Sequence, residues 1–161
     1  MKRIALHFPR IWKAALYAVL ATSWLTGTTW FTLHRWVRIE GDFGEEHSAW
    51  EPVLIKIHGA SAMLVMVYFG YLLATHVPVG LRSRRNRALG LTLVYAIGFM
   101  IVTSYGLYYL GSEGIREVVS WAHTAVGFCL PLVLGLHVAI GHRSKPANTK
   151  PLALPRPRSI S

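Results

Sequence analysis

The stretch that decides the fold class runs from Ile57 to Leu81 and reads IHGASAMLVMVYFGYLLATHVPVGL. It contains no Asp, Glu, Lys or Arg, and it is longer than the roughly 20 residues that a helix needs to cross the hydrocarbon of a bilayer. Three further uncharged blocks occupy residues 14–33, 88–112 and 118–142. The sequence therefore predicts an all-α, polytopic membrane protein that folds as an antiparallel bundle of four transmembrane helices.

The charged residues and prolines that flank these blocks set the expected helix bounds. The helices are predicted at about residues 11–33, 53–77, 88–110 and 116–141. Pro52 suits the first turn of the second helix because its φ is fixed near the helical value, whereas Pro78 predicts that this helix ends near Val77. Residues 1–142 are expected to form one transmembrane, haem-binding domain, and the basic, Pro-rich segment 143–161 is expected to be a disordered cytoplasmic tail.

The chain has 161 residues and a formal net charge of +10, and its charges are sorted along the sequence. Most of the 17 Lys and Arg residues lie before the first block, between the second and third blocks, or in the tail, whereas all seven acidic residues lie in the other two connections. The positive-inside rule therefore predicts a multi-pass protein of a bacterial inner membrane with both termini in the cytoplasm. The basic runs are short and adjacent to the bilayer, so they do not favour binding to nucleic acid.

Four of the eight histidines lie on only two of the predicted helices, His58 and His76 on the second and His123 and His137 on the fourth. The interval from His58 to His76 makes about five full turns, so both rings leave one helix face about 27 Å apart. The interval from His123 to His137 returns to within about 40° of one face and spans about 21 Å. Because the second and fourth helices run in the same direction, His58 is expected to meet His123 near the outer surface, and His76 to meet His137 near the cytoplasm.

Paired imidazoles at two depths of a membrane bundle match the axial ligands of two stacked haems, because haem iron takes its axial ligands from opposite sides. Ionisable side chains within membrane spans are costly and usually functional. The chain has one cysteine and no Cys-x-x-Cys-His motif, so covalent c-type attachment is excluded. The sequence thus predicts two non-covalent haems b, with iron bound by His58 and His123 and by His76 and His137, and transmembrane electron transfer as the function.

Small and basic residues near these histidines are further candidates for the cofactor sites. Gly59 and Gly127 lie close to the predicted ligands, where a small residue leaves room for a porphyrin, although ordinary helix packing explains them equally well. Arg35, Arg38 and Lys56 are candidates to pair with the propionates of the outer haem. Their alternative role is that of flanking charges that set the topology.

The segments His58-Gly59 to His76 and His123 to Gly127 and His137 resemble the small four-helix b-type cytochromes of bacteria. The spacing of His123 and His137 also resembles that in the ligand helices of respiratory cytochrome b, whereas the interval from His58 to His76 is longer. The resemblance covers about residues 54–142. It implies an oxidoreductase chain that carries electrons through two haems b, with a quinone and an external or membrane redox protein as expected partners.

Two other functions remain open at this stage. A membrane protein that binds or transports a divalent metal would use histidines and carboxylates of the outer face, which suit several such ions. The candidates for this alternative are His34, His47 and His58 with Asp42, Glu45 or Glu46. A cofactor-free membrane anchor or assembly subunit would instead use its histidines only for hydrogen bonds between helices.

Overall fold

The structure, a computed structural model, describes residues 9–41, 44–83 and 86–143. The helices are α1 (Arg10–Trp36), α2 (Glu51–Ser83), α3 (Arg87–Tyr109) and α4 (Glu113–Arg143), and the strands are β1 (Ile39–Gly41) and β2 (Gly44–Glu46). The predicted all-α class and the four predicted helices are confirmed. Asp42 and the predicted disorder of the tail at residues 144–161 lie outside the described residues.

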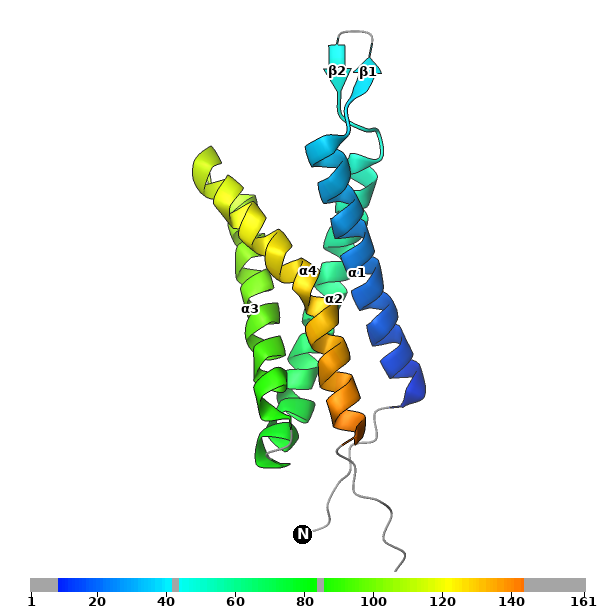
Figure 1. Cartoon of the computed structure of the whole chain (residues 1–161), viewed down its shortest axis with the longest axis vertical. Helices are drawn as coiled ribbons and strands as arrows, with labels where there is room; N and C mark the ends of the chain where they lie inside the picture. The colour runs from blue at the N-terminus through cyan, green and yellow to red at the C-terminus, as the bar shows by residue number, and fades with distance from the viewer. Residues whose placement is uncertain (1–8, 42–43, 84–85, 144–161) are drawn as a thin grey trace, which may run out of the picture.

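The four helices form two closely packed antiparallel pairs, α1 with α2 and α3 with α4, which contact each other less extensively (Figure 1). The hairpin of β1 and β2 lies at the top of Figure 1, at the end of the bundle where α1 ends and α2 begins. The connection from α3 to α4 lies toward the same end, which we call the hairpin end. The end of α2 and the start of α3 lie at the opposite end, which we call the far end.

Three helices, α2, α3 and α4, are long and apolar enough to cross a membrane. Their apolar side chains are largely exposed, for example Val67, Val118 and Leu132, and Phe31 is the only buried hydrophobic residue among those described. Such an apolar surface is unfavourable in water and suits a bilayer.

Helix α1 differs from the other three because it carries many hydroxyl side chains. Its 27 residues are long enough to cross a bilayer, but their composition does not place α1 among the candidate spans. The hydroxyl groups of Thr26 and Thr32 donate to the backbone carbonyls of Thr22 and Thr28, one turn earlier in the helix. These polar groups are therefore satisfied within α1 itself.

The predicted end of the second helix near Val77 is wrong, because α2 continues through Pro78 to Ser83. Proline removes one backbone donor and disfavours the helix, but membrane helices tolerate proline better than soluble ones do. The nearby hydroxyl groups of Thr75 and Ser83 donate to the carbonyls of Tyr71 and Gly80, and neither of these is the carbonyl one turn before Pro78.

The hairpin between α1 and α2 was not predicted. Its two strands pair antiparallel with Ile39 opposite Glu46 and Glu40 opposite Glu45. Each strand has only three residues, which is too short for an alternating apolar pattern to appear in the sequence. Gly44 has a φ of +122°, a conformation that favours glycine at the start of the returning strand.

Candidate functional site: two histidine pairs around a cavity

The structure brings the four membrane histidines together as two pairs. The ring centres of His58 and His123 are 6.4 Å apart with an angle of 81° between the planes, and those of His76 and His137 are 6.2 Å apart with an angle of 76°. Two imidazoles on opposite sides of one metal ion, with bonds of about 2 Å and about 1 Å more from each nitrogen to its ring centre, would have centres about 6 Å apart. Both separations match that value, although an edge-to-face ring contact has a similar one.

Hydrogen bonds hold both rings of the hairpin-end pair in the form that binds a metal. The Nδ1 of His58 donates to the carbonyl oxygen of Ser23 on α1, at 2.9 Å. The Nδ1 of His123 donates to the buried hydroxyl oxygen of Thr103 on α3, at 2.8 Å. The hydroxyl group has one proton, and where it donates this proton to the carbonyl of Phe99, 2.8 Å away, its oxygen accepts from the imidazole. The Nε2 lone pairs of both rings are therefore left for a metal ion, with the orienting partners typical of ligand histidines.

The far-end pair has a different hydrogen-bond arrangement. The side-chain amide nitrogen of Asn86 donates to the carbonyl oxygen of His137, at 2.8 Å, and to its Nδ1, at 3.2 Å. The bond to the carbonyl fixes the amide orientation, so Nδ1 accepts and the neutral ring carries its proton on Nε2. Among the described residues, no hydrogen bond holds the ring of His76. The ring spacing of this pair therefore suits two ligands of one metal ion, but the Nε2 of His137 carries a proton and has no lone pair to give to a metal.

Gly27 on α1 leaves the space that the ring of His58 fills. A Cβ atom at this position would lie 2.6 Å from Cε1 and 2.7 Å from Nδ1 of His58, so any side chain here would displace the ring. Gly27 and Ser23 together thus position His58 from the neighbouring helix. Sequence reasoning missed both residues because their role depends on how α1 packs against α2, which helical periodicity does not reveal.

The two predicted small residues have different environments. A Cβ atom on Gly59 would meet no other atom within 4 Å, and Gly59 lines the cavity described below. Packing within this chain therefore does not explain the glycine. A Cβ atom on Gly127 would lie 3.2 Å from Cε of Met100, so helix packing does account for that position.

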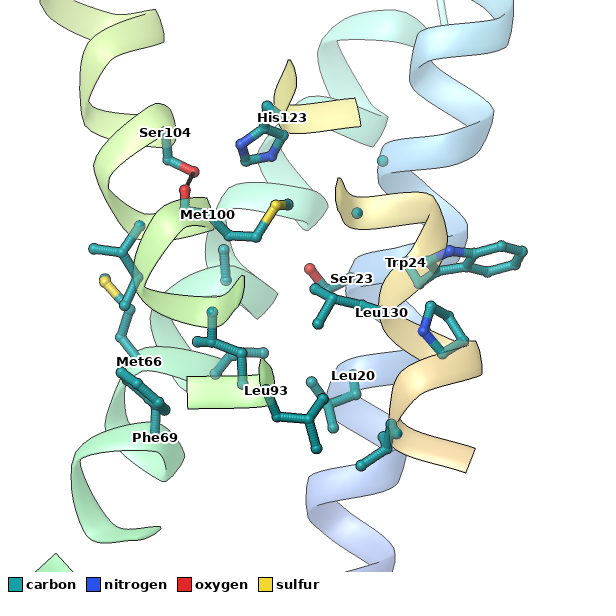
Figure 2. A pocket seen from close by; sticks show the side chains of 18 of the residues that line it. Leu20, Ser23, Trp24, Met66, Phe69, Leu93, Met100, Ser104, His123 and Leu130 are labelled. Carbon is teal, nitrogen blue, oxygen red and sulfur yellow. Dashed lines mark hydrogen bonds between the residues drawn. The ribbon is translucent and has the colours of Figure 1, made fainter. Parts of the chain in front are cut away.

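A cavity of about 3250 Å³ lies between the helices, and all four histidines line it. Figure 2 shows the ring of His123 at the upper part of this space, above Leu93 of α3 and Leu20 of α1. Met66 and Phe69 of α2 also line it. Pockets for one small ligand occupy about 300–1,000 Å³, so this space suits more than one large, flat, apolar cofactor. The donor set and the cavity thus fit two haem groups.

The three predicted propionate partners are in different situations. Arg35 forms an ion pair with Glu117 of α4, at 2.9 Å, and lies over the ring of Trp121. Arg38 donates to the backbone carbonyls at the end of α1 and is not part of the cavity lining. Lys56 is exposed, lines the cavity and has no ion pair within the described part of the chain. Of the three, Lys56 is best placed to meet a carboxylate in the cavity.

The outer metal site considered from the sequence has a different composition in the structure. His34 and His47 do lie together, but their carboxylate partner is Glu51, the first residue of α2. His58 faces His123 instead, and Glu45 lies in β2 opposite Glu40. Glu46 pairs with Ile39 in the same hairpin. The four-residue spacing of His47 and Glu51 at a helix start is the signal that could have identified this group.

The described chain is thus a helical protein with three helices able to span a membrane, and it holds two histidine pairs around one cavity. No protein-family model matches the sequence, and neither a curated protein nor a solved structure is detectably similar to it.

Proposed function

We propose that this chain is an electron-transfer protein of a bacterial inner membrane that binds two haems b without covalent attachment. His58 and His123 would hold one haem, and His76 and His137 the other. The observation that supports this most strongly is the separation of the ring centres, 6.4 and 6.2 Å, at two levels of one cavity. Haem ligated by two imidazoles supplies a one-electron iron couple with both axial positions filled, which favours electron transfer over binding of a substrate to iron.

The hydrogen bonds of the hairpin-end pair also favour metal ligation over a simple contact between two rings. An edge-to-face contact stabilises two rings without requiring either tautomer. In this pair, both Nδ1 atoms instead donate to oxygen acceptors, Ser23 and Thr103, on neighbouring helices. This arrangement orients both ligand rings and leaves both Nε2 atoms for iron.

The proposal includes four membrane spans, with α1 as the first, and both termini in the cytoplasm. The distribution of Lys and Arg supports this orientation because most of them flank the far end of the bundle or lie in the tail. The hairpin end would then face the periplasm. Contacts of α1 with His58, through Ser23 and Gly27, also support the proposal that α1 lies beside the haem bound by this histidine.

The expected electron partners are a quinone of the bilayer and a redox protein at one of the two surfaces. Acidic residues of the hairpin, Glu40, Glu45 and Glu46, are exposed and would present a negative surface to a basic external partner. Such an encounter would weaken as ionic strength rises.

The haem content of the purified protein tests the proposal. We expect a pyridine haemochrome assay to give a b-type spectrum and about two haems per chain, because two ligand pairs are present. A colourless protein, after expression with an adequate haem supply, would contradict the proposal. A ratio near one would contradict two-haem binding and leave one pair as the site.

A further inference from the structure

A second group of ligand-type side chains lies at the hairpin end, apart from the two histidine pairs. Glu51 is buried, with 7% of its surface exposed, and its two carboxylate oxygens accept from two different imidazoles. The Nδ1 of His34 lies 2.8 Å from Oε2, and the Nδ1 of His47 lies 3.0 Å from Oε1. Three separate segments meet here: the last turn of α1, the residues after β2, and the start of α2.

Both imidazoles take part in stacking interactions. The ring of His34 stacks on Trp30 on one side, with centres 4.7 Å apart, and on His47 on the other, with centres 4.8 Å apart. The planes are nearly parallel, at 11° and 10°, so both rings present their Nδ1 edges to the same carboxylate. Ligand atoms of the three residues all lie within 4.8 Å of one another.

We propose that His34, His47 and Glu51 form a binding site for a divalent metal ion of the zinc class. Two imidazole nitrogens and one carboxylate oxygen are a ligand set that Zn²⁺ uses, with bonds of about 2.0–2.2 Å and the fourth position open to water. Imidazole donors favour Zn²⁺ over Mg²⁺ and Ca²⁺, which prefer oxygen ligands. Because the two stacked rings lie in nearly parallel planes, one ring must turn out of the stack so that the ion lies in the planes of both. The metal then replaces the two hydrogen bonds to Glu51, while each Nδ1 proton moves to the Nε2 of the same ring, so both imidazoles stay neutral.

The two imidazoles are partly exposed, so a metal ion can reach the proposed site from solvent. The side chains of His34 and His47 are 46% and 49% exposed, so water and small ions reach the rings, whereas the carboxylate of Glu51 lies underneath. A metal bound here links the end of α1 to the start of α2 across the hairpin. The site lies seven residues before His58, about 10 Å along α2, and shares no ligand with the haem pairs.

Zinc binding to the full-length protein tests this inference. The protein is purified in detergent without a polyhistidine tag, treated with a chelator and titrated with Zn²⁺, with bound zinc measured by elemental analysis and affinity by calorimetry. We expect about one tightly bound zinc ion per chain. His47→Ala and Glu51→Gln should each weaken binding by about 100-fold or more, because each removes a direct ligand and loss of even an outer partner costs about 10- to 100-fold.

Matched variants separate this site from general binding by surface acids and histidines. Glu45→Gln removes an exposed carboxylate of the hairpin, and His142→Ala removes an exposed imidazole at the far end of α4. Both should bind zinc as the original chain does. If Glu51→Gln fails to fold, His47→Ala still decides, because the His47 side chain is half exposed and its loss removes a ring stack at the surface rather than a buried contact.

The inference is overturned if the original chain retains no more zinc than His47→Ala does. It is equally overturned if the double variant His34→Ala, His47→Ala binds zinc with the original affinity. The haem-to-protein ratio, measured on the same samples, reports separately on the membrane histidines. A colourless protein that binds zinc through His47 would refute the haem proposal and support the metal site.

Discussion

The two histidine pairs have nearly the same spacing but different hydrogen-bond partners. In the hairpin-end pair, the rings of His58 and His123 each donate to an oxygen on a neighbouring helix. In the far-end pair, Asn86 donates to the Nδ1 of His137. The ring spacing depends on how the helices pack, whereas the tautomer depends on individual hydrogen-bond partners: the Ser23 carbonyl, the Thr103 hydroxyl and the Asn86 amide. We therefore expect the hairpin-end pair to bind a metal without a change of tautomer. At the far-end pair, the proton of His137 must first leave Nε2.

Removing a ligand from either pair should have the largest effect. His123→Ala should eliminate the hairpin-end haem, and His137→Ala the far-end haem, because each substitution deletes one axial bond at one level. The haem-to-protein ratio should fall from about two to about one in each variant, and the two difference spectra should differ. His142→Ala serves as the control and should keep both haems. Loss of the same spectral component in both variants would refute the two-level arrangement.

Adding a methyl group at Gly27 should have the next largest effect. Gly27→Ala places a Cβ atom 2.6 Å from Cε1 of His58, so the ring must move. Overpacking of this kind costs about 1–3 kcal/mol, which corresponds to about 5- to 150-fold in haem affinity. Titration of the haem-free protein with haemin measures the loss.

The matched control for Gly27 lies at the other pair. In Gly90→Ala, the new Cβ atom would lie 3.4 Å from Cε1 of His137, close to ordinary contact. This variant should change the affinity of the far-end site by much less. Equal losses in Gly27→Ala and Gly90→Ala would show that the methyl group weakens helix packing in general rather than moving His58.

Removing the partner of His123 should have a moderate effect. Thr103→Val keeps the side-chain shape but leaves the Nδ1 of His123 without its acceptor. Loss of such a partner costs about 10- to 100-fold in metal affinity, and for a neutral hydroxyl we expect the lower value. Thr92→Val is the control, since this hydroxyl group bonds only to the backbone of its own helix. Unchanged haemin affinity in Thr103→Val would mean that the hydroxyl does not orient the ligand.

Removing the amide of Asn86 should have the smallest effect and the opposite sign. Asn86 has a φ of 50°, so Asn86→Gly removes the side chain without straining the backbone. His137 is then free to adopt the ligating tautomer, and haem affinity at the far end should rise by a few fold. The hairpin-end site should not change. Weaker far-end binding in this variant would show that Asn86 supports the ligand instead of opposing it.

The sequence predicted the helices well because long uncharged blocks and helical periodicity are properties of single segments. The same periodicity placed His58 and His76 on one face of α2, and His123 and His137 on one face of α4. The interval lengths alone suggested a mismatch of about 6 Å between the two helices. The rings nevertheless meet at both levels.

Most of the features that sequence reasoning missed depend on contacts between segments. Ser23, Gly27 and Thr103 act on histidines of other helices, and no pattern within one helix marks them. In the sequence, Glu51 is one of the seven acidic residues of the two outer connections, and its four-residue spacing from His47 is the only local sign of its role. The continuation of α2 through Pro78 was missed because the helix-breaking tendency of proline is weaker in membrane helices than in soluble ones.

Electron paramagnetic resonance of the oxidised protein tests the central claim most directly, because it reports on the axial ligands of each ferric iron. With ring planes at 81° and 76°, both sites should give low-spin signals of the strongly anisotropic kind that near-perpendicular imidazoles produce. One signal should disappear in His123→Ala and the other in His137→Ala. A high-spin signal in the original protein, or low-spin signals that survive both substitutions, would contradict ligation by these histidines.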